Sequence, residues 1–222
     1  YYDENITDTI NFLKKLEEKN LKNTKIKFFK YYSSPKRVNE IEKLNYKFIK
    51  HNNKFLDWSG YMSVQNYLNK EKYDFCLFLN DTLVKKRYFG FFFSIWLNKA
   101  INLFLKKKIE LACPYDTDKD IDWMCSYLFL VKPKIINSYF NQIKLNKFLN
   151  ILDKTEQKKI QDWINYSWRR SNHSDKKTKL KKMNTIFIEK SFLKLISISK
   201  IFKYEKFSFF RIMNSIERRI LK

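Results

Sequence analysis

The chain has 222 residues, of which 44% are hydrophobic and 18% aromatic, and its formal net charge is +23. This apolar content excludes a disordered chain and predicts one folded domain, alone or with a helical extension. No apolar run approaches the roughly 20 residues that span a bilayer, so the sequence predicts no membrane-spanning helix.

In the first 146 residues, the spacing of apolar residues predicts helices that alternate with strands. The expected helices cover 7–19, 37–44, 60–69, 93–106 and 134–142, and the expected strands cover 25–32, 46–50, 74–80, 109–113 and 126–131. Pro114 is expected to end the fourth strand, and an acidic loop is expected at 116–122. Such alternation is typical of a parallel or mixed sheet with helices on both faces.

The most informative stretch is Tyr73–Thr82, which combines an apolar strand with polar residues at its end. A continuous apolar run predicts a strand in the centre of a parallel sheet, covered on both faces. Ligands of open α/β sheets bind beyond the carboxyl ends of the strands, where Asn80 and Asp81 are expected. Two glycines, Gly60 and Gly90, flank this stretch, and we expect each to mark a backbone position that tolerates nothing larger.

Beyond Asn146 the pattern changes to helices alone, expected at 155–168, 179–200 and 206–221. From Lys132 onward there are 23 Lys and Arg residues against 7 Asp and Glu residues. We therefore predict an α/β domain at 1–146 and a basic helical extension at 147–222. Such a surface attracts nucleic acid, anionic lipid headgroups or acidic ligands, although a solvated lysine-rich face is the simplest interpretation of most of these lysines.

The three cysteines, Cys76, Cys113 and Cys125, lie in apolar, strand-like contexts. Their number is odd and no pair has C-x-x-C spacing, so buried reduced thiols are favoured over a disulfide or a zinc site. Reduced thiols are typical of a cytosolic protein. We expect a cytoplasmic location, either free or attached peripherally to the inner face of the membrane.

Two segments carry a family resemblance: His51–Tyr61, with the sequence HNNKFLDWSGY, and Tyr73–Thr82, which ends in LNDT. They resemble polysaccharide glycosyltransferases of the rhamnan-synthesis F type, which carry Asn-x-Gly-x-Asp-aromatic-Gly-Gly, then a helix, then a strand ending in Asn-Asp-Ser. The residues that match in order and spacing are Asn53, Asp57, Trp58, Gly60, Asn80 and Asp81. Phe55 and Ser59 stand where the family has glycines, and Thr82 replaces serine.

A third segment, Met124–Phe129, resembles the family's strand after the acidic loop, where the motif reads His-hydrophobic-Gln-Ser-Tyr. Trp123 occupies the histidine position and Cys125 the glutamine position. The resemblance covers residues 1–143. The opening YYDE is similar to the residues that follow the family's first strand, which is then expected upstream of this sequence.

The resemblance implies a GT-A-like fold and a nucleotide-sugar donor, which would be bound by Asn53, Asp57, Trp58, Gly60 and Asn80. Folds of this type place a metal-binding carboxylate after a central strand, commonly as Asp-x-Asp, and Asp81 is the carboxylate that remains here. One carboxylate, with waters and phosphate oxygens, is enough to hold Mg²⁺ or Mn²⁺. Such a metal neutralises the diphosphate leaving group of the donor.

Several of these residues also have a purely structural interpretation. Asn80 and Asp81 fit a turn and cap after a strand, and Asp57 fits the N-cap of the helix predicted at 60–69. In the acidic loop, Asp120 and Asp122 are candidates for the general base that deprotonates an acceptor hydroxyl. An ordinary solvent-exposed acidic loop is the alternative.

We expect a glycosyltransferase that moves a sugar from a nucleotide-sugar donor onto a glycan or lipid-linked acceptor of cell-surface polysaccharide or lipopolysaccharide. One alternative is a basic non-catalytic module that binds nucleic acid or an acidic partner, and another is an interaction protein that kept the fold and lost activity. The sequence contains no helix-turn-helix, zinc or RNP signature, so no specific nucleic-acid binding is expected. Clustering of Asn53, Asp57 and Asp81 around one cleft would favour the enzyme.

Overall fold

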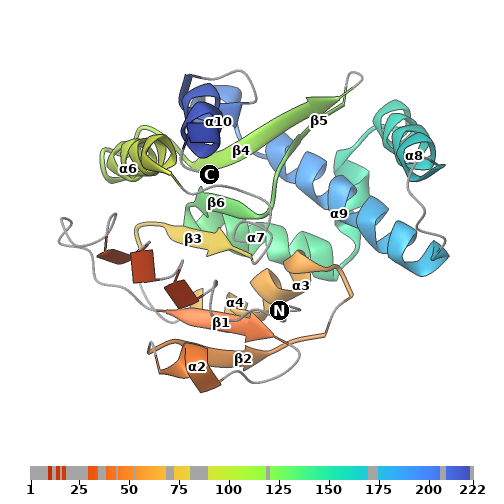
Figure 1. Ribbon diagram of the computed structural model, residues 1–222. Helices are drawn as coiled ribbons and strands as arrows, with labels where there is room; N and C mark the ends of the chain where they lie inside the picture. The colour runs from red at the N-terminus through yellow and green to blue at the C-terminus, as the bar shows by residue number, and fades with distance from the viewer. Residues whose placement is uncertain are drawn as a thin grey trace.

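The computed structural model is an α/β protein in which a mixed sheet lies between two groups of helices (Figure 1). It describes residues 10–11, 14–15, 17–18, 30–34, 39–43, 45–52, 54–68, 73–80, 90–118, 121–169, 175–205 and 209–220. The described residues between 10 and 18 are helical, as the sequence predicts.

The described elements divide into strands, α-helices and two short 3-10 helices. The strands are β1 (Tyr31–Ser34), β2 (Lys47–Lys50), β3 (Cys76–Leu79), β4 (Leu111–Asp118), β5 (Ile121–Met124), β6 (Leu128–Val131) and β7 (Ile201–Glu205). The α-helices are α2 (Asn39–Glu42), α3 (Asp57–Ser63), α4 (Gln65–Leu68), α6 (Phe91–Leu105), α7 (Pro133–Lys144), α8 (Lys154–Arg169), α9 (Lys176–Lys194) and α10 (Phe209–Ile220). The 3-10 helices are η1 (Lys147–Ile151) and η2 (Ile198–Lys200).

The sheet has the strand order β3-β6-β4-β5, and β7 pairs with the other edge of β4. Strand β6 runs antiparallel to β3 and β4, β5 runs antiparallel to β4, and β7 runs parallel to β4. Strands β1 and β2 form a separate parallel pair, drawn below β3 in Figure 1. The sheet is therefore mixed, in agreement with the coarse expectation.

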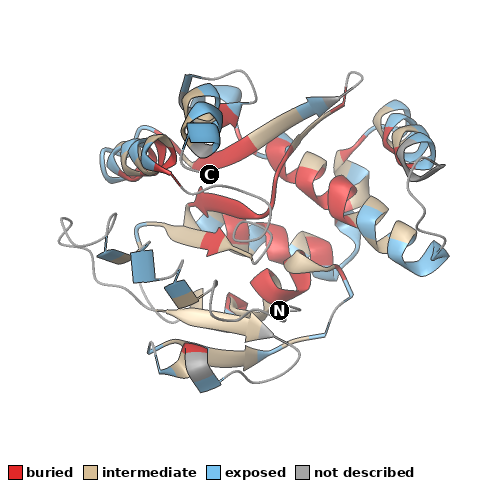
Figure 2. Cartoon of the chain, in the orientation of Figure 1, coloured by how far each residue is buried: buried red, intermediate tan, exposed pale blue. Residues whose placement is uncertain are grey.

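Both faces of the sheet are buried, because successive strand residues point to opposite sides. In β3, Phe78 enters a core that it shares with α7 and α9, whereas Leu77 and Leu79 pack against a second core formed with α6. Figure 2 shows these buried residues in the middle of the molecule. The expectation of a strand covered on both faces is confirmed. The expectation of a central strand in a parallel sheet is wrong, since β3 is the end strand of the described sheet and pairs antiparallel with β6.

Strand β4 continues through Pro114 to Asp118, so the prediction that it ends at the proline is wrong. Pro114 lies between the residues of β4 that pair with β6 and those that pair with β5. Proline has no N–H to donate to a neighbouring strand. A strand tolerates proline at a position such as this one, where its pairing changes from one neighbour to another. The Pro114 carbonyl oxygen accepts the backbone N–H of Cys125 at 2.8 Å.

The second half of the chain also contributes to the sheet, although the sequence predicts no strand beyond Asn146. This prediction is wrong, because β7 pairs with β4 from Leu111 to Tyr115. In addition, Phe192 of α9 lies in the same core as Phe129 of β6. The two predicted parts of the chain thus share one sheet and one hydrophobic core.

Gly60 does not have the backbone role expected of it. Gly60 lies inside α3, Gly90 is the N-cap of α6, and both have a negative φ. A Cβ placed on Gly60 would meet Ser33 Oγ at 3.5 Å and His51 Nε2 at 3.7 Å, which are ordinary van der Waals contacts. A methyl group therefore fits at Gly60, so the expectation that nothing larger is tolerated there is wrong.

Candidate functional site

The loop Cys125–Tyr127 connects β5 to β6 and is held by three other parts of the chain. The Tyr61 hydroxyl of α3 donates to the Ser126 carbonyl oxygen at 2.6 Å. The Asn80 N–H, at the end of β3, donates to the Tyr127 carbonyl oxygen at 3.0 Å. The Ser126 N–H donates to Glu189 Oε1 of α9 at 3.1 Å. We call this loop, with Asp57, Tyr61, Asn80 and Glu189, the junction site.

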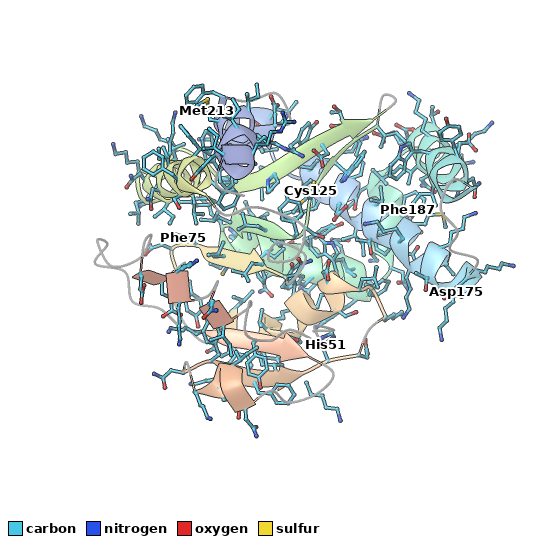
Figure 3. The ribbon with its side chains drawn as sticks, in the orientation of Figure 1. His51, Phe75, Cys125, Asp175, Phe187 and Met213 are labelled. Carbon is cyan, nitrogen blue, oxygen red and sulfur yellow. The ribbon has the colours of Figure 1, made fainter. Side chains whose placement is uncertain are left out.

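The junction site brings together segments that the sequence analysis singled out separately. Helix α3 comes from the first resembling segment, Asn80 from the second, and the loop Cys125–Tyr127 from the third. Figure 3 labels Cys125 near the middle of the molecule. The carboxyl end of β3 thus lies beside the loop, where the sheet-edge argument expects a ligand.

Glu189 is a carboxylate within the hydrophobic core, with a relative exposure of 3%. Burial raises its pKa to about 7, and the nearby Asp57 carboxylate adds to this, while Lys182 and the Ser126 hydrogen bond oppose it. Within the described residues Glu189 forms no ion pair. A carboxyl group with a pKa near neutrality can release and take up a proton at physiological pH.

The sequence analysis did not identify Glu189. A signal was present, because Glu189 is the one acidic residue in the run Thr185–Leu193, which reads TIFIEKSFL. Charged residues are almost never fully buried unless paired, so a lone acid in an apolar helical stretch indicates either an ion pair or a site.

Asp57 is the first residue of α3, and Leu56 holds the N-cap position with φ 49°. The structural interpretation of Asp57 as the N-cap is therefore wrong. The first turn is closed instead by Ser59, whose Oγ accepts the Phe55 N–H at 2.7 Å. A carboxylate in the first turn of a helix is favoured by the helix dipole, and Asp57 lies close enough to Glu189 to raise its pKa.

Trp58 lies entirely in the core, with no exposed surface. Its ring stacks on Phe129 and meets Tyr61, Tyr139 and Phe192 edge to face. The side chain therefore has no surface left for a donor, and its place in the resembling motif is explained by packing. Trp123 is half-buried and packs against Trp163 of α8.

Residues 116–118 and 121–122 of the acidic stretch lie in the paired strands β4 and β5, so the expectation of a loop is wrong for these residues. Asp122 lies in β5, forms an ion pair with Lys190 and accepts the Tyr115 hydroxyl. Asp116 accepts Arg211 Nη1 at 2.5 Å and the Cys125 thiol at 3.2 Å. Burial and the Asp116 carboxylate raise the pKa of Cys125 well above its ordinary value, so this thiol is neutral and can donate.

Three predicted site residues, Asn53, Asp81 and Asp120, lie outside the described residues. Of the residues predicted to cluster, Asn80 bonds to the loop through Tyr127, and Asp57 lies in the same helix as Tyr61, which bonds to Ser126 of that loop. Gly60 lies in the same helix as Asp57 and is buried against Ser33 and His51.

All three cysteines are free thiols, as predicted, and burial raises the pKa of Cys76 to about 12. Within the described ranges, no group of three or more His, Cys, Asp or Glu side chains is arranged to hold a metal ion. In the same part of the chain, no helix combines the length and apolarity needed to cross a bilayer.

Comparisons of this chain with protein-family models, with curated proteins and with solved structures find no match.

Proposed function

We propose that the chain is a nucleotide-sugar-dependent glycosyltransferase with a GT-A-like fold, acting on a glycan or lipid-linked acceptor. The observation that carries the proposal is the junction site. Three segments chosen for their resemblance to one enzyme family share a set of hydrogen bonds around the loop Cys125–Tyr127. These contacts place α3, the end of β3 and the loop Cys125–Tyr127 side by side, which supports the proposal.

The donor would lie at the carboxyl end of β3, between Asn80 and the start of α3. Asp57 would accept hydrogen bonds from hydroxyl groups of the ribose or the sugar. Asn53 is proposed as a further donor contact.

In the reaction, the acceptor hydroxyl oxygen forms a bond to the anomeric carbon while the bond from that carbon to the diphosphate oxygen breaks. The electron pair leaves with the nucleoside diphosphate, and the hydroxyl proton passes to a carboxylate. Glu189 has the pKa for this step, because a base that titrates near pH 7 is both free to accept the proton and basic enough to do so. Asp122 is less suited, since its carboxylate is already paired with Lys190 and accepts a hydrogen bond from the Tyr115 hydroxyl. Asp120 remains the other candidate base.

A divalent metal, Mn²⁺ or Mg²⁺, would supply charge neutralisation for the leaving diphosphate. Asp81 is proposed as its protein ligand, directly after Asn80. Few protein ligands are required, because such ions keep several waters and bind substrate phosphates. Asn80, whose backbone is bonded to Tyr127, fixes the position from which the chain leaves β3.

A thermal-shift screen of nucleotide sugars, with and without Mn²⁺, tests the proposal. One member of the panel should raise the melting temperature of the wild type, and more so with the metal. Asp57→Asn should abolish this shift, because it removes the carboxylate while keeping the size and shape of the side chain.

The matched control is Asp162→Asn on the exposed side of α8, which should respond to the donor as the wild type does. Absence of any shift in the wild type, or an equal shift in Asp57→Asn, would contradict the proposal. Stabilisation by duplex DNA instead would favour a basic nucleic-acid-binding module.

A further inference from the structure

Helix α10 exposes an apolar stripe to solvent. Its stripe residues Phe209, Ile212, Ile216 and Ile220 have relative exposures of 65%, 44%, 42% and 75%. Their spacing of three or four residues places them on one side of the helix. In a surface helix of a globular protein this stripe normally faces the core.

Two polar residues of α10 bind the rest of the protein. Arg211 Nη1 donates to Asp116 Oδ1 at 2.5 Å and to the Tyr115 carbonyl oxygen at 3.3 Å. The Glu217 carboxylate accepts the backbone N–H of Phe91 at 2.8 Å and of Phe92 at 3.4 Å, at the start of α6. These contacts hold the helix with its apolar stripe turned outward.

Phe91 of α6 extends the stripe, and its neighbour Phe92 links it to Phe209. Phe92 makes ring contacts with both Phe91 and Phe209, at centroid distances of 5.5 and 6.0 Å. Phe91 is itself 62% exposed. We call the set Phe91, Phe209, Ile212, Ile216 and Ile220 the α10 face. Figure 2 shows the exposed side of α10 at the outer edge of the molecule, and Figure 3 labels Met213 on the same helix.

Helices α6 and α10, which carry the α10 face, have more basic than acidic residues. Helices α6 and α10, with the three lysines that follow α6, contain seven basic residues and one acidic residue. The acidic residue is Glu217, whose carboxylate is bonded to the start of α6. Lys106, Lys107, Lys108 and Arg219 are exposed.

We propose that the α10 face binds an anionic phospholipid membrane, with α10 lying in the plane of the interface. An apolar stripe on a helix with an exposed Arg219, next to α6 and the three lysines that follow it, suits this environment, because the apolar side chains enter the boundary of the acyl chains while the cations meet lipid phosphates. A second copy of this chain would bring two positive faces together, and a nucleic acid would leave the isoleucines without an apolar partner. The inference goes beyond the proposed function and does not depend on it.

Flotation of the full chain with vesicles tests the inference. Wild type should bind phosphatidylcholine vesicles with about 30% phosphatidylglycerol at least about tenfold more tightly than pure phosphatidylcholine vesicles. The double variant Ile212→Ser/Ile216→Ser should lose about tenfold or more of the binding to the anionic vesicles. Both side chains are exposed, so the fold should be retained, which circular dichroism checks.

The control is Leu145→Ser/Leu180→Ser, which alters two exposed leucines away from α10. Leu145 follows α7 and is 63% exposed, and Leu180 lies in α9 and is 52% exposed. It should bind as wild type does. Wild-type binding by Ile212→Ser/Ile216→Ser would overturn the inference and assign the membrane affinity to lysines elsewhere. Light scattering gives a second test. If the wild type is a dimer and Ile212→Ser/Ile216→Ser is a monomer, the α10 face joins two copies of the chain and the inference is overturned. Failure of the folded wild type to bind anionic vesicles would also overturn it.

Discussion

Glu189 is a buried carboxyl group whose ionisation affects the stability of the protein. Its carboxyl group titrates at about 7 when folded, against an ordinary value of 4.5. Between these values the folded protein binds a proton that the unfolded chain has released. The contribution of Glu189 to stability is therefore fully present below about pH 4.5 and is lost as the pH rises through 7. The difference of pKa corresponds to roughly 3 kcal/mol.

Glu189→Gln should remove this pH dependence. Glutamine keeps an oxygen that can accept the Ser126 N–H, but it cannot ionise. The free energy of unfolding of the variant should exceed that of wild type at pH 8, and the difference should shrink toward pH 5. Urea denaturation across this range measures it, with Asp162→Asn as the control. Parallel curves for wild type and Glu189→Gln would show that the buried carboxyl group does not titrate as described.

At the scale of elements, α10 is anchored by the ion pair between Arg211 and Asp116, whose side chains are 15% and 20% exposed. Breaking a partly buried ion pair leaves a desolvated carboxylate, which costs about 1–3 kcal/mol. The same carboxylate accepts the Cys125 thiol, so the anchor of α10 is linked to the loop of the junction site. An α10 bound to a membrane would therefore hold the junction site at a fixed height above that surface.

Arg211→Met should loosen α10 while leaving the rest of the sheet intact. The backbone amides of residues 209–220 should exchange with deuterium faster than in wild type, and amides of β6 should be unchanged. Arg219→Met is the matched control, because Arg219 lies on the same helix and is exposed. If both variants exchange alike in α10, the ion pair does not anchor the helix.

The strands of the sheet differ in how well their sequences predict them. Runs such as Cys76–Leu79 and Leu128–Val131 are apolar on both faces, so their burial follows from composition alone. Strand β7 is missed because IFKYE follows a long helix without a glycine or proline to mark the break. It is specified by pairing with β4, which is a contact between distant parts of the chain.

The sequence also does not predict the direction in which neighbouring strands pair. Alternating strands and helices predict a parallel or mixed sheet without saying which strands run antiparallel, and in the structure β6 inserts antiparallel between β3 and β4. The loop Cys125–Tyr127 allows this, since it carries the chain onward from β5, in the same direction along β4, into Leu128–Val131, which pairs with both β3 and β4. The candidate site, too, could be predicted only in part. Asp57 and Asn80 could be named from motifs, but Glu189 enters the junction site through tertiary packing.

For the molecule as a whole, the central claim is that the end of β3 and the start of α3 bind a nucleotide sugar with a divalent metal. Isothermal titration calorimetry of wild type and Asp81→Asn, with and without Mn²⁺, tests it most directly. Asparagine is as good a turn and cap residue as aspartate, so the melting temperature should stay nearly constant. The claim predicts that Mn²⁺ strengthens donor binding to wild type and that Asp81→Asn loses this gain. An unchanged metal-dependent affinity in Asp81→Asn would contradict it.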